Sequence, residues 1–80
     1  MTPIDPTAAV LGVALAMLSD DDDTAYPLAA WLTGNDVRRM SLLAWTINEW
    51  NTAGCHHHGI DTWRLKLVTA LGNHLGHHTQ

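Results

Sequence analysis

The stretch NDVRRMSLLAWTINEWNT, residues 35–52, decides the fold of this 80-residue chain. Asn35 and Asp36 are residue types that cap helix N-termini, because their side chains accept hydrogen bonds from free backbone N–H groups. At about 100° per residue, the apolar residues that follow share one arc, as in an amphipathic helix. The pattern predicts a helix over residues 36–52, closed by Gly54, with a core face of Val37, Met40, Leu43, Ala44, Ile47 and Trp50.

A second helix is predicted ahead of this stretch, over residues 6–19. Asp5 is a suitable N-cap, and Pro6 is tolerated in a first helical turn. The segment is apolar on every side, so it should be the central and most buried helix.

Two shorter signals complete the pattern. Thr24 as an N-cap and Gly34 as a stop bound a helix over residues 25–33. Asp61 caps a helix over residues 61–75, and residues 55–59 are expected to form the preceding loop. The core face of this last helix is expected to consist of Trp63, Leu67, Val68, Leu71 and Leu75.

No period-two alternation typical of strands, internal repeat or linker occurs in the chain. The sequence therefore predicts an all-α, compact, bundle-like single domain over residues 1–80, with a frayed C-terminal tail at 76–80. Its helices are expected at roughly 6–19, 25–33, 36–52 and 61–75.

Composition narrows the classes of function. The formal net charge is −4, with only four Lys and Arg residues, which argues against a protein that coats nucleic acid or an anionic membrane. The longest stretch without an ionisable residue is too short to span a membrane. A single cysteine fits a reducing compartment, so we expect a cytoplasmic protein.

Apolar residues outside the predicted core indicate protein binding. Leu42 and Trp45 lie one turn apart on the polar side of the 36–52 helix, beside Arg38 and Glu49. Trp31 lies near the end of the preceding helix. Trp and Arg are typical anchors of protein interfaces, so these five residues are candidates for a partner-binding or homodimer surface.

The acidic residues are concentrated in one place. Half of the acidic residues, Asp20, Asp21, Asp22 and Asp23, lie in one run. Consecutive carboxylates do not converge on one ion, and the alternating ligands of a calcium loop are absent. The run is expected to be a solvated loop between two helices, or a site for a basic partner surface.

Helix-turn-helix DNA binding is the main alternative. The segment from Pro27 to Trp45 loosely has the spacing of that motif, with Gly34 in the turn. Arg38 and Arg39 would then begin the recognition helix, which starts at Asp36.

Zinc binding is a third hypothesis. Cys55, His56 and His58 lie in the expected loop, whereas His74 and His78 follow about one helix length later. Helix rise alone separates the two groups by roughly 20 Å, so one intramolecular zinc site is disfavoured and no cofactor is expected.

The sequence shows no catalytic motif: no phosphate loop, no metal-hydrolase signature and only one Glu. We therefore expect a non-enzymatic protein-interaction module. A phage-type or accessory regulator that binds or inhibits a host protein, or that self-associates, fits its size and acidity.

Overall fold

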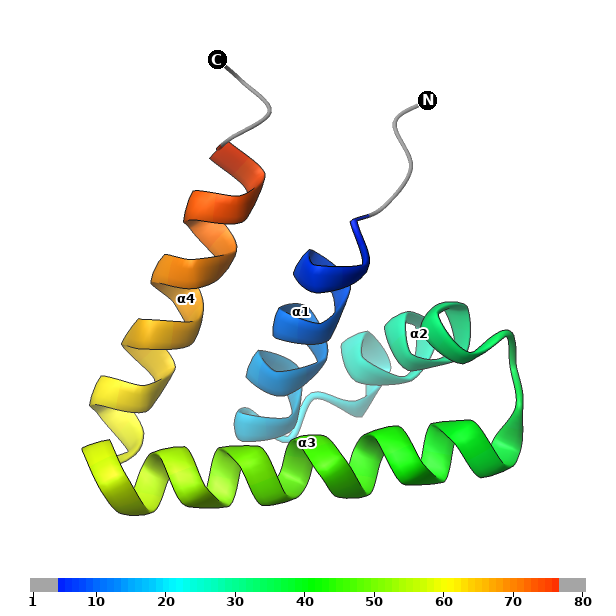
Figure 1. Ribbon diagram of the computed structural model, residues 1–80, viewed down its shortest axis with the longest axis horizontal. Coiled ribbons are helices and arrows are strands. Elements are labelled where there is room, and N and C mark those ends of the chain that lie inside the picture. Colours follow the sequence, from blue (N-terminus) through cyan, green and yellow to red (C-terminus); the bar gives the residue numbers. More distant parts are fainter. Residues whose placement is uncertain (1–4, 77–80) are drawn as a thin grey trace.

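The computed structural model describes residues 5–76, and in this part of the chain it is an all-α domain of four helices (Figure 1). The helices are α1 (Pro6–Leu18), α2 (Asp22–Thr33), α3 (Val37–His58) and α4 (Ile60–Gly76). The all-α, bundle-like fold predicted from the sequence is confirmed.

Aspartates begin the first three helices. The side chain of Asp5 accepts a hydrogen bond from the N–H of Thr7 at the start of α1. Asp21 accepts one from Thr24 at the start of α2, and Asp36 accepts one from the N–H of Arg39 at the start of α3. These bonds satisfy backbone donors that the first turn leaves free. Helix capping therefore explains much of the acidic composition.

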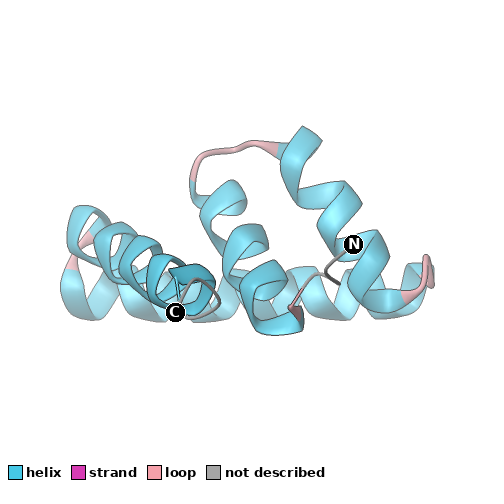
Figure 2. Ribbon diagram, turned by 90° about the horizontal axis from the view of Figure 1, so that it is seen from above, coloured by secondary structure: helices cyan, strands magenta, loops and turns pink. Residues whose placement is uncertain are grey.

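The helices form a flat molecule, with extents of 37 × 35 × 17 Å. α1 lies between α2 and α4, and α3 runs along one edge, across the ends of α1 and α4 (Figure 1). Seen from above, α3 runs the whole length of the molecule (Figure 2). A molecule this thin has little interior, which leaves several large apolar side chains in contact with water.

α1 is the central helix, as its sequence predicted. It packs against all three other helices and supplies six of the eleven buried apolar residues in the described part of the chain. Its small residues allow close approach: a Cβ added to Gly12 would lie 3.0 Å from the side chain of Leu28 in α2. The rest of the buried core comes mainly from Ala25, Ile47, Trp63 and Leu67.

Two predicted helix boundaries are wrong, and so is the cap predicted for the last helix: Asp61 lies in the first turn of α4 (Ile60–Gly76) and does not cap it. α2 begins at Asp22, not at residue 25, because Asp21 and not Thr24 is the N-cap. α3 runs past Gly54 to His58, so residues 55–58 are helical and not a loop. Gly59, at φ 85°, separates α3 from α4, which starts one residue later.

The end of α4 also differs from the prediction. The helix includes Gly76, where a frayed tail was expected to begin. Residues 77–80 of that tail lie outside the described part of the chain.

The predicted core face of α3 is only partly correct. Ile47 is buried and Met40 and Leu43 are partly buried, but Ala44 is exposed, and Val37 and Trp50 are 75% and 40% exposed. Asn51 and Gly54 are buried instead, because α3 packs most tightly through its second half, against α1 and α4. In α4, Trp63 and Leu67 are buried as expected, whereas Val68 and Leu75 are about half exposed.

Candidate interaction surface on α3

A buried polar cluster fixes the position of α3 against its neighbours. The side-chain amide of Asn51 donates a hydrogen bond to the carbonyl oxygen of Ala14 in α1, over 3.1 Å. Its oxygen accepts a hydrogen bond of 2.9 Å from the indole Nε1–H of Trp63 in α4. One side chain thus joins three helices. The sequence analysis did not find this residue.

Trp63 rests directly on the backbone of α3. A Cβ added to Gly54 would lie 2.2 Å from the Trp63 ring, so only glycine leaves room for the indole here. Trp50 packs against Trp63 edge-on, with ring centroids 5.2 Å apart. These contacts determine which side of α3 faces the protein and which side faces away.

The opposite side of α3 carries a row of exposed side chains. Arg38, Leu42, Trp45 and Glu49 fall on one stripe, about 180° around the helix from Ile47, Asn51 and Gly54. Leu42 and Trp45 are 64% and 63% exposed, and both charged residues are exposed. We call these four residues the α3 ridge. Leu42 and Trp45 therefore lie on the exposed side of the helix, as the sequence predicts.

The α3 ridge is free of the charge pairs described in the molecule. Within residues 5–76, the ion pairs join Asp61 to Arg64 and Asp5 to His74, so neither involves Arg38 or Glu49. Because α3 forms one edge of the flat molecule, no other helix lies beyond the ridge (Figure 1). The ridge is therefore accessible along its length.

A shallow groove of about 530 Å³ lies on an adjoining side of α3. It is bounded by α1, α2 and the first half of α3, and among its lining residues Asp22 is the charged one. Its lining is otherwise mostly apolar: Val13, Met17, Ala25, Tyr26, Ala29, Val37, Met40, Ser41 and Ala44. Trp31, the other predicted anchor, is 47% exposed on α2 and is not one of these residues.

The acidic run has a local structural role. Asp21 accepts hydrogen bonds from both the N–H and the hydroxyl of Thr24, and Asp22 and Asp23 lie in the first turn of α2. Carboxylates at this end of a helix interact favourably with its dipole. Asp20 adopts a left-handed backbone conformation, with φ 54°. Only part of the run is therefore a loop.

The two arginines of the DNA-binding alternative lie at the start of α3. α2 ends at Gly34 in a left-handed conformation, and Arg38 and Arg39 are exposed in the first turn of α3. The part of the chain that leads into this turn has no basic residue, however. Asp36 precedes the arginines, and no Lys, Arg or His occurs between residues 5 and 37.

The cysteine and the described histidines fall into two separate groups, one at the end of α3 and the other, His74, near the end of α4. Cys55, His56 and His58 belong to the last turn of α3, where consecutive side chains point in different directions. The ring of His58 stacks on Trp63 at an interplanar angle of 2°. Loss of hydration lowers the pKa of His58, and the charges of His57 and Lys66 lower it further.

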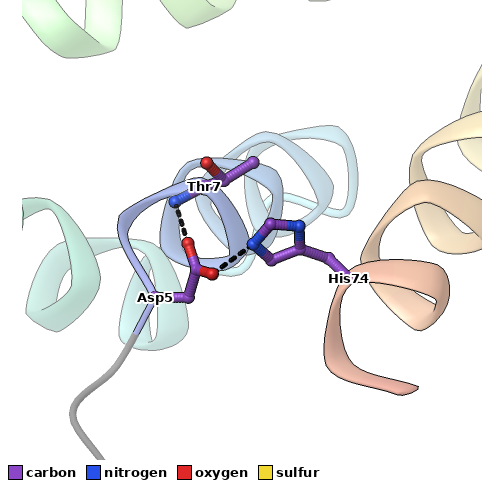
Figure 3. A network of polar contacts seen from close by, with 3 residues as sticks. All are labelled: Asp5, Thr7 and His74. Atoms are coloured by element: carbon purple, nitrogen blue, oxygen red, sulfur yellow. Dashed lines mark hydrogen bonds and ion pairs between the residues drawn. The ribbon is translucent and has the colours of Figure 1, made fainter. Parts of the chain in front are cut away.

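His74 lies at the far end of α4, where its ring contacts the carboxylate of Asp5 at the start of α1 (Figure 3). The hydrogen bond from Thr7 holds the pKa of Asp5 below its ordinary value, and His74 lowers it further. His78 lies outside the described residues. Among residues 5–76, no three His, Cys, Asp or Glu side chains come together to hold a metal ion.

In the described part of the chain, no helix has both the length and the apolar character needed to cross a bilayer.

The fold and this surface define a class: a small four-helix domain with an exposed ridge of two apolar and two charged residues. In comparisons with known proteins, no protein family, no curated protein and no solved structure matches the chain.

Proposed function

We propose that this chain is a non-enzymatic protein-interaction module that binds a protein through the α3 ridge. The observation that carries the proposal is the exposure of Leu42 and Trp45 between Arg38 and Glu49, on the side of α3 that faces away from the core. Apolar anchors flanked by charges are typical of protein interfaces.

The same arrangement supports binding over catalysis. Cys55, the one nucleophilic thiol, is helical, and consecutive side chains on a helix do not face each other. His56 and His57 are therefore poorly placed to act as its base, and the ring of His58, one turn further on, stacks on Trp63. A regulator that acts by occupying a surface of another protein, as phage-type and accessory inhibitors do, needs only the ridge.

A photo-crosslinking amino acid at position 42 tests the proposal. We expect irradiation of the purified protein, and of the protein in a native lysate, to give a protein adduct that disappears on Trp45→Ala. The matched control carries the crosslinker at Thr69, an exposed position of α4. If position 42 gives no more adduct than position 69 in either setting, the ridge does not bind protein.

DNA binding by α3 is the competing hypothesis, and salt separates the two. Contacts with phosphates weaken steeply as salt rises, because counterions are released on binding. A gel-shift titration in which Arg38→Ala with Arg39→Ala abolishes binding would favour DNA over a protein partner.

A further inference from the structure

We propose that the partner of the α3 ridge is a second copy of this chain, bound with the two α3 helices antiparallel. This inference rests on the proposed function, because it names the protein that the ridge binds. Its starting point is the spacing of the ridge residues 38, 42, 45 and 49. Steps of four, three and four place them on one seam, as in the a and d positions of a coiled coil.

The side chains of the α3 ridge are complementary to those of a second α3 ridge that runs in the opposite direction. A two-fold axis between residues 43 and 44 places Arg38 of one copy opposite Glu49 of the other, and Leu42 opposite Trp45. Both ion pairs and both apolar pairs form at once, since the symmetry repeats every contact. Shifting the register by one turn separates the opposite charges. The order of charge, apolar, apolar, opposite charge therefore selects the second copy and the antiparallel direction.

The surroundings of the seam permit this approach. Ser41 and Thr46, which flank the seam, oppose each other in the same register and are short and exposed. Because α3 forms a free edge of the molecule, a second α3 can lie beside it without meeting α1, α2 or α4 (Figure 1). Two-fold dimers of this kind are the commonest soluble homo-oligomers.

Within residues 5–76, neither charged residue of the ridge forms an ion pair in its own copy. Eleven residues of helix separate Arg38 from Glu49 by about 16 Å, too far for an ion pair. In the dimer, Arg38 and Glu49 each form an ion pair with the opposite charge of the second copy. A single helix pair is small beside the roughly 800 Å² per partner of a standard interface, so we expect a dissociation constant of roughly 1–100 µM.

Charge reversal with complementation tests the proposal by sedimentation equilibrium. Wild-type protein should reach twice its 8.8 kDa mass as concentration rises. Arg38→Glu and Glu49→Arg alone should each weaken dimerisation at least tenfold, because each places like charges opposite one another. An equimolar mixture of these two variants should dimerise again, since one copy then supplies both acids and the other both bases.

Arg39→Glu is the matched control, because it makes the same change in net charge one residue off the seam. It should leave dimerisation within about twofold of wild type. Circular dichroism verifies that each variant is helical. Should a variant not fold, disulfide formation between Leu42→Cys and Trp45→Cys chains, in a Cys55→Ser background, supplies the same test, and no disulfide heterodimer overturns the proposal.

A wild-type chain that stays monomeric, or a mixture that fails to restore the dimer, overturns the second copy as partner. The crosslinking at position 42 then distinguishes the two failures. Adducts with other proteins that need Trp45 leave the proposed function standing, whereas no adduct at all removes both.

Discussion

The indole nitrogen of Trp63 lies 2.9 Å from the side-chain oxygen of Asn51, and both residues are buried. The Asn51 amide also donates to Ala14, so this one side chain connects α3 to α4 and to α1. Buried polar groups cost free energy when they lose their partners, so this cluster holds the domain in one arrangement.

Removing the amide should be strongly destabilising. Asn51→Ala leaves the buried Trp63 N–H without its acceptor, which costs about 1–3 kcal/mol, and it also removes the second hydrogen bond to the Ala14 carbonyl. We expect urea unfolding to show a loss of about 2–4 kcal/mol in the free energy of unfolding. Asn48→Ala, an exposed change one turn away, should stay within about 0.5 kcal/mol. Equal effects of the two variants would contradict the cluster.

Two Gly→Ala variants distinguish the effect of packing on stability from the effect of helix propensity. Gly54→Ala drives a methyl group into the Trp63 ring, and we expect a net loss of about 2 kcal/mol from overpacking. Gly72→Ala, in α4, meets nothing within 4 Å and should gain up to about 1 kcal/mol from helix propensity alone. Thermal unfolding of both variants checks the opposite signs. A stabilising Gly54→Ala would mean that Trp63 does not rest on α3.

The acidic run offers a test of its local role. Asp21→Ala removes the cap of α2 and should cost about 1 kcal/mol. Asp20→Gly relieves a left-handed backbone and one repulsive charge, and should gain up to about 1 kcal/mol. Asp20→Asn distinguishes the two causes, because it removes the charge and keeps a side chain. If Asp21→Ala is neutral, capping does not explain the run.

Acidification should weaken the fold through Asp5. The pKa of Asp5 is lower in the folded chain than its ordinary value of 3.8, so its contribution is complete above that value. It is lost as pH falls through the folded pKa. The difference in Tm between wild type and Asp5→Asn should therefore be largest near neutral pH and shrink below pH 3.8. A difference that does not change with pH would contradict the role of the charge.

His58 gives a second pH effect with a direct readout. Its folded pKa lies below the ordinary 6.5, so protonation opposes folding and stability declines as pH falls from 6.5 through the folded pKa. Titration of its ring proton by NMR should show a midpoint below 6.5, which returns to 6.5 in denaturant. A folded-state midpoint at or above 6.5 would contradict the loss of hydration at His58.

The number of helices and their approximate positions along the chain can be predicted from the sequence, because the signals that start and end a helix are local. Asp36 and Gly34 act within one turn of the chain, where capping is decided. Gly54 misled the prediction, since glycine is typical of helix ends. Its actual reason for being glycine is a tryptophan nine residues further on, which no local pattern reveals.

The failure to predict Asn51 as a core residue has a similar explanation. Asn51 is polar, so a hydrophobic pattern excludes it from the core, and its burial depends on partners in two other helices. Val37 was assigned to the core by periodicity, but it lies at the end of α3 that packs less tightly and is 75% exposed. Leu42 and Trp45 were found because apolar residues on a polar helix face contradict the period itself.

The contact between Asp5 and His74 brings the first and last turns of the helical domain together, at the edge opposite to α3 (Figures 1 and 3). An affinity tag or fusion partner at either end would therefore be attached away from the ridge. A short linker could also join the two ends, with the chain reopened at the turn between Gly34 and Asn35. Such a circular permutant keeps every helix contact of the domain while changing which helix is made first.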